Sequence, residues 1–334
     1  MRFLLYLLIG AASIAMLYFL FIFLSFRINR KWFEKFPGEG KITDINGKKV
    51  FMRVKGEGDT IVVINATGSS QAEWWPVQDT LGHRYRVITY DRSGYGWSTA
   101  DEKPKTVQNI CDELDLILNL EGVDKPVYIV SGGTGAIYAL YFAMTRPGKT
   151  AGVLFINPVP YEYDIWLDNV NYTEDFCNIF ETAQRMEKYA SKGVYRILNP
   201  LRGYKPDKKY KRYIAEHYTR IENYKTIKAE LDELVNSARL LKNNVFPPVP
   251  LRILNTSIEF LIREWVKNGA SEYSARQLGR LLETIIKDYM LLSSDTVFVE
   301  VTGTGEHIHL SQPEKVAEEI SEMINGHNIK KAAH

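Results

Sequence analysis

The chain has few cysteines and almost no net charge, and these two shortages exclude several classes of protein. Its two cysteines, Cys111 and Cys177, are too few for a disulfide framework, and they match neither a CxxC nor a Cys/His zinc pattern. We therefore expect no metal site and no cofactor. The formal net charge is +2 and no basic stripe is interleaved with aromatic residues, so we expect no nucleic-acid partner.

Charge is missing altogether from one long stretch at the N-terminus. Residues 3–26 contain no Asp, Glu, Lys or Arg, and a helix of that length, at about 1.5 Å per residue, can cross a hydrocarbon core of about 30 Å. The small residues of this stretch lie within the apolar run, whereas a signal peptide carries them after it, at the cleavage site. We predict an uncleaved transmembrane helix over 3–26 and a basic linker over 27–40.

The side of the membrane is less constrained by the sequence. Arg2 and the α-amine precede the apolar run, and four basic residues follow it closely: Arg27, Arg30, Lys31 and Lys35. The positive-inside tendency slightly favours a cytoplasmic domain on a single-pass protein of the cell membrane. The opposite orientation stays open.

Strand and helix signals alternate after the linker. Residues 41–45 and 49–54 flank Asn46-Gly47, a typical two-residue hairpin turn. The β-branched run 60–65 (TIVVIN) suits a strand buried on both faces. Further strands are expected at 86–90, 126–130, 152–157, 251–254 and 296–301, and helices at 71–81, 106–120, 135–144 and 313–324.

This order predicts an α/β fold with a mostly parallel sheet and helices on both faces. Residues 41–160 and 250–326 would form the core. Residues 161–249 are polar and rich in tyrosine, include a charged helical stretch over 207–242, and would form a helical cap inserted into the core.

Three motifs in this order resemble those of the α/β-hydrolase-fold superfamily. Residues 90–98 (YDRSGYGWS) resemble the turn after its fourth strand, and residues 131–135 (SGGTG) stand where the family has the G-x-S-x-G nucleophile elbow. Residues 303–310 (GTGEHIHL), followed by Gln312-Pro313, resemble its histidine loop. The resemblance covers roughly 41–160 and 250–324, is greatest to bacterial esterase-like hydrolases with a membrane anchor, and implies the α/β-hydrolase fold.

The same resemblance implies a degenerate catalytic triad. The family's nucleophile position falls on Gly133, its histidine on Glu306, and its acid on Asn157 or Asn255. An asparagine does not stabilise an imidazolium as a carboxylate does. Glycine at a strained elbow relieves backbone strain of about 1–3 kcal/mol once no side chain is needed there.

Other residues are candidate substitutes for the missing groups. Ser131 and Thr134 flank the elbow, and His307 follows Glu306 by one position. The backbone N–H groups of Thr67 and Thr134 would form the oxyanion-type site beside the N-terminus of a helix, suited to a carboxylate or phosphate. His309 is expected to make a structural hydrogen bond.

The sequence therefore favours a membrane-anchored, non-catalytic protein that binds or senses a small molecule, with the tyrosine-rich cap as one wall of the pocket. The alternative is an active ester or amide hydrolase that acts on an ester-like substrate through shifted catalytic residues. A glycine turn at 132–135 after a strand is also typical of dinucleotide binding, but Tyr138 stands where the third glycine is expected.

Overall fold

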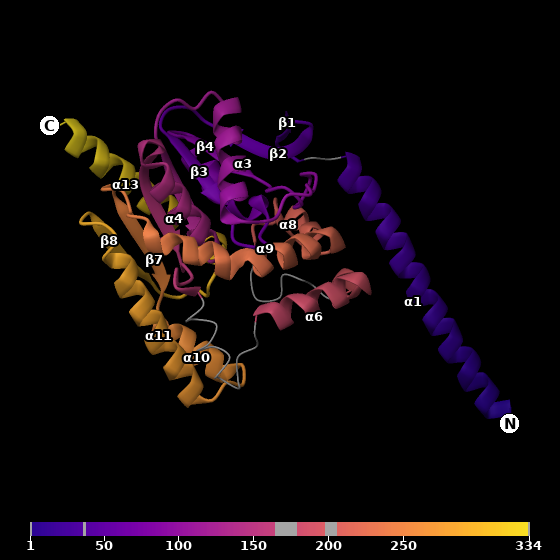
Figure 1. The fold of residues 1–334 in the computed structure, drawn as a ribbon. Helices are drawn as coiled ribbons and strands as arrows, with labels where there is room; N and C mark the ends of the chain where they lie inside the picture. Colours follow the sequence, from indigo (N-terminus) through magenta and orange to yellow (C-terminus); the bar gives the residue numbers. More distant parts are fainter. Residues whose placement is uncertain (1, 36–37, 164–178, 198–205, 333–334) are drawn as a thin grey trace.

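The structure, a computed structural model, describes residues 2–35, 38–163, 179–197 and 206–332. Its centre is an eight-stranded sheet with the strand order β1-β2-β4-β3-β5-β6-β7-β8 (Figure 1). The pairs β1–β2 and β2–β4 are antiparallel and all other neighbours are parallel, which confirms the predicted mostly parallel sheet. The strands are β1 (Lys41–Ile45), β2 (Lys48–Lys55), β3 (Thr60–Ile64), β4 (Arg86–Tyr90), β5 (Val127–Gly132), β6 (Thr150–Ile156), β7 (Leu251–Thr256) and β8 (Thr296–Val301).

The first hairpin forms at the predicted turn. Asn46 and Gly47 have φ angles of 54° and 82°, the left-handed pair that a two-residue type I′ turn requires. Glycine reaches this region without steric cost, and asparagine is one of the few other residues that adopts it readily. The turn residues alone therefore set the register between β1 and β2.

Two helical layers cover the sheet, as the sequence predicts. Alternate residues of β3 separate cleanly: Ile61 and Val63 pack on one face, and Val62 and Ile64 on the other. The face of Ile61 meets α2 and α13, and the opposite face meets α3, α4 and α11. Because both faces are covered, β3 reads as an unbroken apolar run. These helices are α2 (Trp75–Leu81), α3 (Val107–Leu120), α4 (Gly135–Thr145), α11 (Glu272–Met290) and α13 (Pro313–Ala332).

A single long helix, α1 (Arg2–Lys35), begins the chain and extends away from the sheet (Figure 1). Within the described residues, its segment Arg2–Ser25 alone is long and apolar enough to cross a membrane, and none of that segment is buried against the rest of the protein. Signal sequences share these properties. The helix continues to Lys35, so most of the stretch predicted as a linker is helical. Its basic residues are good helix formers, which explains the continuation.

The cap and its neighbours differ from the prediction in three respects. The charged stretch 207–242 is two α-helices, α8 (Lys211–His217) and α9 (Ile221–Arg239), because the chain becomes extended at Arg220. The last helix runs on to Ala332. Between β7 and β8 lie α10 (Ile258–Lys267) and α11, which were not predicted from the sequence. The predicted cap, 161–249, also contains α6 (Ile179–Ser191) and α7 (Val194–Ile197). Two of its segments, 164–178 and 198–205, lie outside the described residues.

Polar contacts bind α8 and α9 to the core. Glu230 of α9 forms an ion pair with Arg92 at 2.8 Å, and both side chains are almost fully buried. The Arg92 guanidinium also donates to Asn65 O at 2.6 Å. On α8, His217 Nε2 donates to Gly68 O at 2.8 Å. The loop after β3 is therefore held between the cap and the turn after β4.

Candidate functional site

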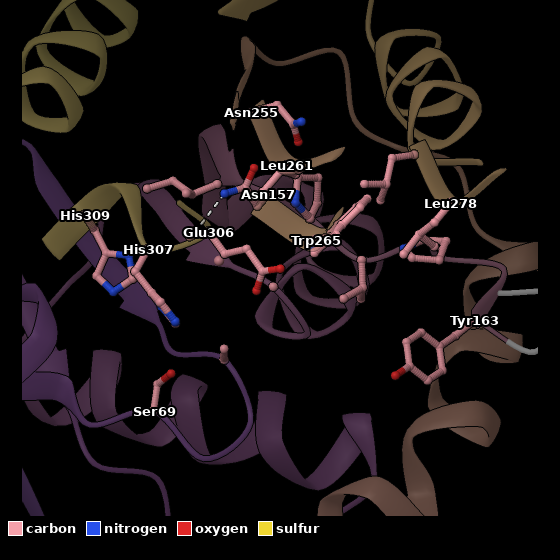
Figure 2. Close-up of a pocket in the computed structure, with 18 of the residues that line it drawn as sticks. Ser69, Asn157, Tyr163, Asn255, Leu261, Trp265, Leu278, Glu306, His307 and His309 are labelled. Atoms are coloured by element: carbon pink, nitrogen blue, oxygen red, sulfur yellow. Dashed lines mark hydrogen bonds between the residues drawn. The ribbon is translucent and has the colours of Figure 1, made fainter. Parts of the chain in front are cut away.

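A cavity of about 380 Å³ opens where the parallel strands end (Figure 2). Ligands in open α/β sheets bind at the carboxyl ends of the strands. The polar side of the cavity is formed by residues at or just after the ends of five strands: β3, β5, β6, β7 and β8. Its apolar wall is formed by α10 and α11. The lining residues that the following paragraphs use are Ser69, Trp74, Gly133, Asn157, Tyr163, Asn255, Leu261, Trp265, Leu278, Leu282, Glu306, His307 and His309.

Gly133 lies at the sharp turn between β5 and α4, at the position that the resemblance assigns to the nucleophile. Its φ angle is +51°, the left-handed conformation of a nucleophile elbow. Its N–H donates to Ile156 O at 3.1 Å, so the turn is bonded to the end of the next strand. A Cβ at this position would meet a single neighbour within 4 Å, the Ala66 Cβ at 3.4 Å. The elbow therefore keeps its shape and has space for a small side chain.

Glu306 and Asn157 occupy the histidine and acid positions of the resemblance. Asn157 Nδ2 donates to Glu306 O at 2.8 Å, and its Oδ1 accepts the Thr256 N–H at 2.8 Å. Asn157 thus fixes the backbone of the loop that carries Glu306. The Glu306 side chain is solvent-accessible within the cavity (Figure 2), and the desolvating walls around it raise its pKa above the usual value. Asn255, the other candidate acid, lines the cavity and donates to Thr256 O at 2.9 Å.

The other hydroxyl candidates of the sequence do not line the cavity. Ser131 is fully buried within β5, and its Oγ has no hydrogen-bond partner. Thr134 Oγ1 accepts the Thr67 N–H at 2.7 Å, so one of the two backbone donors expected for the oxyanion-type site already has a partner. Among the described residues, the hydroxyl groups in the cavity wall belong to Ser69 and Tyr163. Ser69 was missed because nothing in its sequence context marks it.

The apolar wall comes from a different part of the chain than expected. Of the described residues in 161–249, Tyr163 lines the cavity, whereas helices α8 and α9 of the predicted cap contact the loop after β3 and the turn after β4. Leu261 and Trp265 on α10 and Leu278 and Leu282 on α11 supply the wall. The two residues of each pair are four positions apart on an amphipathic helix, a signal that was available in the sequence.

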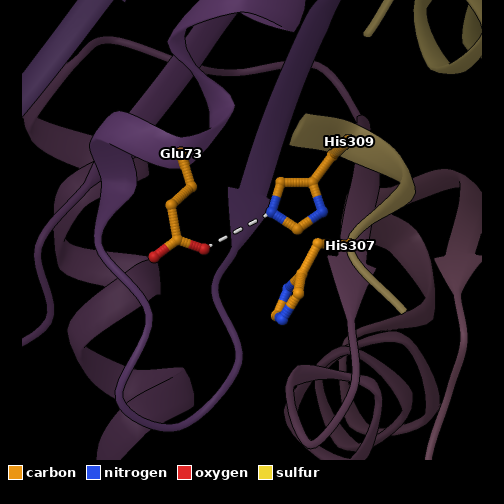
Figure 3. A group of neighbouring side chains, drawn as sticks. All are labelled: Glu73, His307 and His309. Carbon is orange, nitrogen blue, oxygen red and sulfur yellow. Dashed lines mark hydrogen bonds and ion pairs between the residues drawn. The ribbon is translucent and has the colours of Figure 1, made fainter. Parts of the chain in front are cut away.

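His307 and His309 meet a buried glutamate from the opposite end of the sequence. His309 Nε2 lies 3.5 Å from Glu73 Oε2, although the two residues are 236 positions apart (Figure 3). Burial favours the neutral form of Glu73, but the hydrogen bond and charge of His309, the charge of His307 and the Ser70 N–H together outweigh it, so the Glu73 pKa is lowered. Burial is the main cause that lowers the His307 pKa. One ligand atom from each of the three residues lies within 4.8 Å of the others, so this group could hold a metal ion.

Comparison with known proteins identifies the class to which this arrangement belongs. The model of the alpha/beta hydrolase family matches residues 61–319. The chain therefore belongs to the alpha/beta hydrolase family. An AB hydrolase superfamily protein of Gibberella zeae is 22% identical over 312 residues, which are 83% of this chain and 91% of that protein. The 3-oxoadipate enol-lactonase 1 of Acinetobacter baylyi is 32% identical over 109 residues, which are 31% of this chain and 41% of that protein.

Solved structures agree on the fold. The epoxide hydrolase VrEH1 from Vigna radiata superposes with a TM-score of 0.64 at 18% identity and covers 86% of this chain and 98% of its own. At such low identity the likeness shows the fold alone. The side chains of the cavity therefore have to carry any statement about chemistry.

Proposed function

We propose that this family member is anchored in the cell membrane and binds a small molecule in the cavity beside Gly133 without hydrolysing it. The observation that carries the proposal is a glycine at the elbow of an otherwise intact cavity of about 380 Å³. A covalent hydrolase needs an activated nucleophile within reach of a general base. Glycine has no side chain to serve as one, while the elbow that shapes the cavity is retained.

The contacts around the elbow also favour binding over catalysis. The Thr67 N–H, an expected oxyanion donor, is bonded to Thr134 Oγ1, and stabilisation of a developing oxyanion requires donors that are free to meet it. Glu306 stands at the histidine position, and Asn157 holds its backbone instead of orienting an imidazole. The Thr67 N–H and the Asn157 side chain therefore hold the site together and are not free to act on a substrate.

The walls suggest what kind of molecule would bind. Trp265 and the leucines of α10 and α11 provide an apolar surface, and Glu306 offers a carboxylate within it. Such cavities bind largely apolar ligands that are oriented by a few polar groups. We expect a ligand with an apolar body and a hydrogen-bond donor or a cation directed at Glu306. Glu306 would repel an anion, which makes the carboxylate or phosphate expected from the sequence less suitable.

Membrane attachment through α1 would keep the domain at the membrane surface, on the cytoplasmic side by the distribution of basic residues. Protease treatment of intact and permeabilised cells tests the orientation, since a cytoplasmic domain is cleaved only after permeabilisation. The mass of the membrane-extracted protein tests the anchor. A cleaved signal sequence would shorten the chain by the apolar segment.

Restoration of the missing catalytic groups tests the proposal. Full-length protein in lipid nanodiscs is incubated with a fluorophosphonate probe and with p-nitrophenyl esters. We expect the wild type neither to label nor to turn over esters, and Gly133→Ser with Glu306→His to label at residue 133. Gly133→Ala with Glu306→His is the matched control, because it carries the same backbone change without a nucleophile. Labelling of the wild type at any cavity residue would refute the non-catalytic function.

A second candidate function rests on one observation. Ser69 places a hydroxyl group in the wall of the cavity that His307 also lines. In an ester or amide hydrolase, Ser69 would replace the elbow serine as nucleophile and His307 would act as its base. In that case the wild type labels with the probe, and both Ser69→Ala and His307→Ala abolish labelling. Gly133→Ala would then leave the labelling in place.

Ligand binding itself is measured by the thermal shift of the wild type across a metabolite panel, in the presence of EDTA. For any ligand found, Trp265→Ala should raise the Kd at least about tenfold. A tenfold change corresponds to about 1.4 kcal/mol, and full burial of an aromatic side chain contributes more free energy than that. Val266→Ala, on the partly exposed next residue of α10, is the matched control and should leave the Kd unchanged. Equal effects of the two variants would place the ligand elsewhere.

A further inference from the structure

Glu73, His307 and His309 form a group at one side of the cavity, and the binding function proposed above does not require a metal there. We propose that these three side chains form a site for a divalent transition metal of the Zn²⁺ class. Two imidazoles and a carboxylate are a ligand set that Zn²⁺ accepts in proteins, and a site with three protein ligands leaves one position open. One ligand atom from each residue lies within 4.8 Å of the other two.

The spacing of the first two ligands suits a metal better than a hydrogen bond. His309 Nε2 and Glu73 Oε2 are 3.5 Å apart. A hydrogen bond between charged groups of these types is about 2.7–2.9 Å long. Two ligands bound tetrahedrally at about 2.0–2.1 Å from Zn²⁺ are about 3.3 Å apart. An ion between Glu73 and His309 would therefore need almost no movement of either side chain.

Contacts outside the group hold two of the three ligands, Glu73 and His309, in place. Glu73 Oε1 accepts the Ser70 N–H at 3.0 Å and the Tyr218 hydroxyl at 2.8 Å, which leaves Oε2 directed at His309. The His309 ring stacks on Trp74, with ring centroids 4.4 Å apart. Groups that orient metal ligands in this way usually strengthen metal binding.

A separate observation concerns the unmet hydrogen-bonding capacity of His309. The side chain is more than nine-tenths buried, yet its Nδ1 has no hydrogen-bond partner. Buried polar atoms are nearly always bonded, and an unmet one is often explained by a missing water or ion. Because the proposed ion would bind Nε2, Nδ1 stays unbonded with or without it, and the metal site rests on the distances between the three ligand atoms.

The site also has an entry path and an open side. His307 and His309 both line the cavity, whereas Glu73 is fully buried and does not line it. An ion could enter through the cavity and keep its fourth position towards it, where a water molecule or an electron-pair donor on the organic ligand would bind. His307 is only partly buried, so a change of its side-chain rotamer can complete the ligand set.

Titration with Co²⁺ tests this site directly, because tetrahedral Co²⁺ absorbs visible light and Zn²⁺ displaces it. Full-length, tag-free protein in nanodiscs is stripped with EDTA, dialysed and titrated. We expect one equivalent of Co²⁺ to bind with a tetrahedral spectrum, Zn²⁺ to displace it, and Mg²⁺ and Ca²⁺, which prefer oxygen ligands, to have no effect.

Variants assign the ligands. His307→Ala and Glu73→Gln should each weaken Co²⁺ binding at least tenfold, and His83→Ala, which removes an exposed histidine, should not change it. His307 is the informative position if Glu73→Gln unfolds the protein, because a partly buried cavity residue can be truncated with less disturbance. Each variant is first compared with the wild type by metal-free thermal unfolding.

Two outcomes would overturn the metal site. One is the absence of Co²⁺ and Zn²⁺ binding to the wild type at millimolar concentrations, which would leave a hydrogen-bonded pair only. The other is unchanged binding in His307→Ala, which would place the ion elsewhere. Neither outcome bears on organic ligand binding, which is measured in EDTA, so the two proposals fail separately.

Discussion

The conformation of Gly133 allows a quantitative test of how the elbow is built. Its φ angle is +51°, and an L-residue in this left-handed region costs about 1–2 kcal/mol. Steric crowding should add little, because the single neighbour of a new Cβ within 4 Å is the Ala66 Cβ at 3.4 Å, an ordinary van der Waals contact. We therefore expect Gly133→Ala to lower the free energy of unfolding by about 1–2 kcal/mol.

Two other glycines separate backbone strain from crowding. Gly122 has a φ angle of 63° and no atom within 4 Å of a new Cβ, so Gly122→Ala should show the strain alone. Gly148 has equally open surroundings and no positive φ, so Gly148→Ala should be neutral or stabilise by about 0.5 kcal/mol through the unfolded chain. Gly133→Ala and Gly122→Ala should have similar costs, within about 0.5 kcal/mol of each other.

Thermal and urea unfolding of the full-length protein in nanodiscs measure these costs. Each kcal/mol corresponds to a fall in Tm of about 2–4 °C for a domain of this size. A loss above about 4 kcal/mol in Gly133→Ala, with Gly122→Ala near 1, would show that the elbow has no room for a side chain. The idea of an intact hydrolase shell around Gly133 would then be wrong, and Gly133→Ser could not restore activity.

Three further predictions concern buried titratable groups. Glu230→Gln leaves the buried guanidinium of Arg92 without its charge partner and should lower the free energy of unfolding by about 3–5 kcal/mol in a urea titration. Glu222→Gln removes a mostly exposed carboxylate and should change that free energy by less than about 0.5 kcal/mol. Equal effects of the two substitutions would refute the role of the buried pair. Burial raises the pKa of Glu113 to about 7, so the native state holds a proton that the unfolded chain releases above about pH 4.5, and stability should fall as pH rises from about 4.5 to 7. Glu113→Gln should remove this fall in the free energy of unfolding, which is at most about 3 kcal/mol. An unchanged dependence of stability on pH in Glu113→Gln would contradict the raised pKa of Glu113. Burial also raises the pKa of the Cys111 thiol, so this residue should resist alkylation by N-ethylmaleimide in the native protein and react in urea, as peptide mass spectrometry would show; rapid native labelling would contradict its burial.

Local signals in the sequence were sufficient for much of the fold. The Asn46-Gly47 turn requires left-handed backbone, and the structure has it. The apolar run of β3 requires a strand covered on both faces. The motif turns after β4 and β5 identified the fold through the family they resemble. The break within 207–242 was missed because only three residues, 218–220, separate two helices of similar composition.

The candidate site also has features that the sequence predicted and features that only the structure showed. The sequence by itself determined the candidates for the elbow, Gly133, and for the histidine position, Glu306, because both assignments follow from the resemblance of motifs that are contiguous in the chain. Only the tertiary structure decided that Thr134 engages the Thr67 N–H, and that Glu73 meets His309 across 236 positions. The physical reason is that hydrogen bonds and metal ligation depend on distances of about 3 Å between atoms, and the path of the chain through the whole sheet sets those distances.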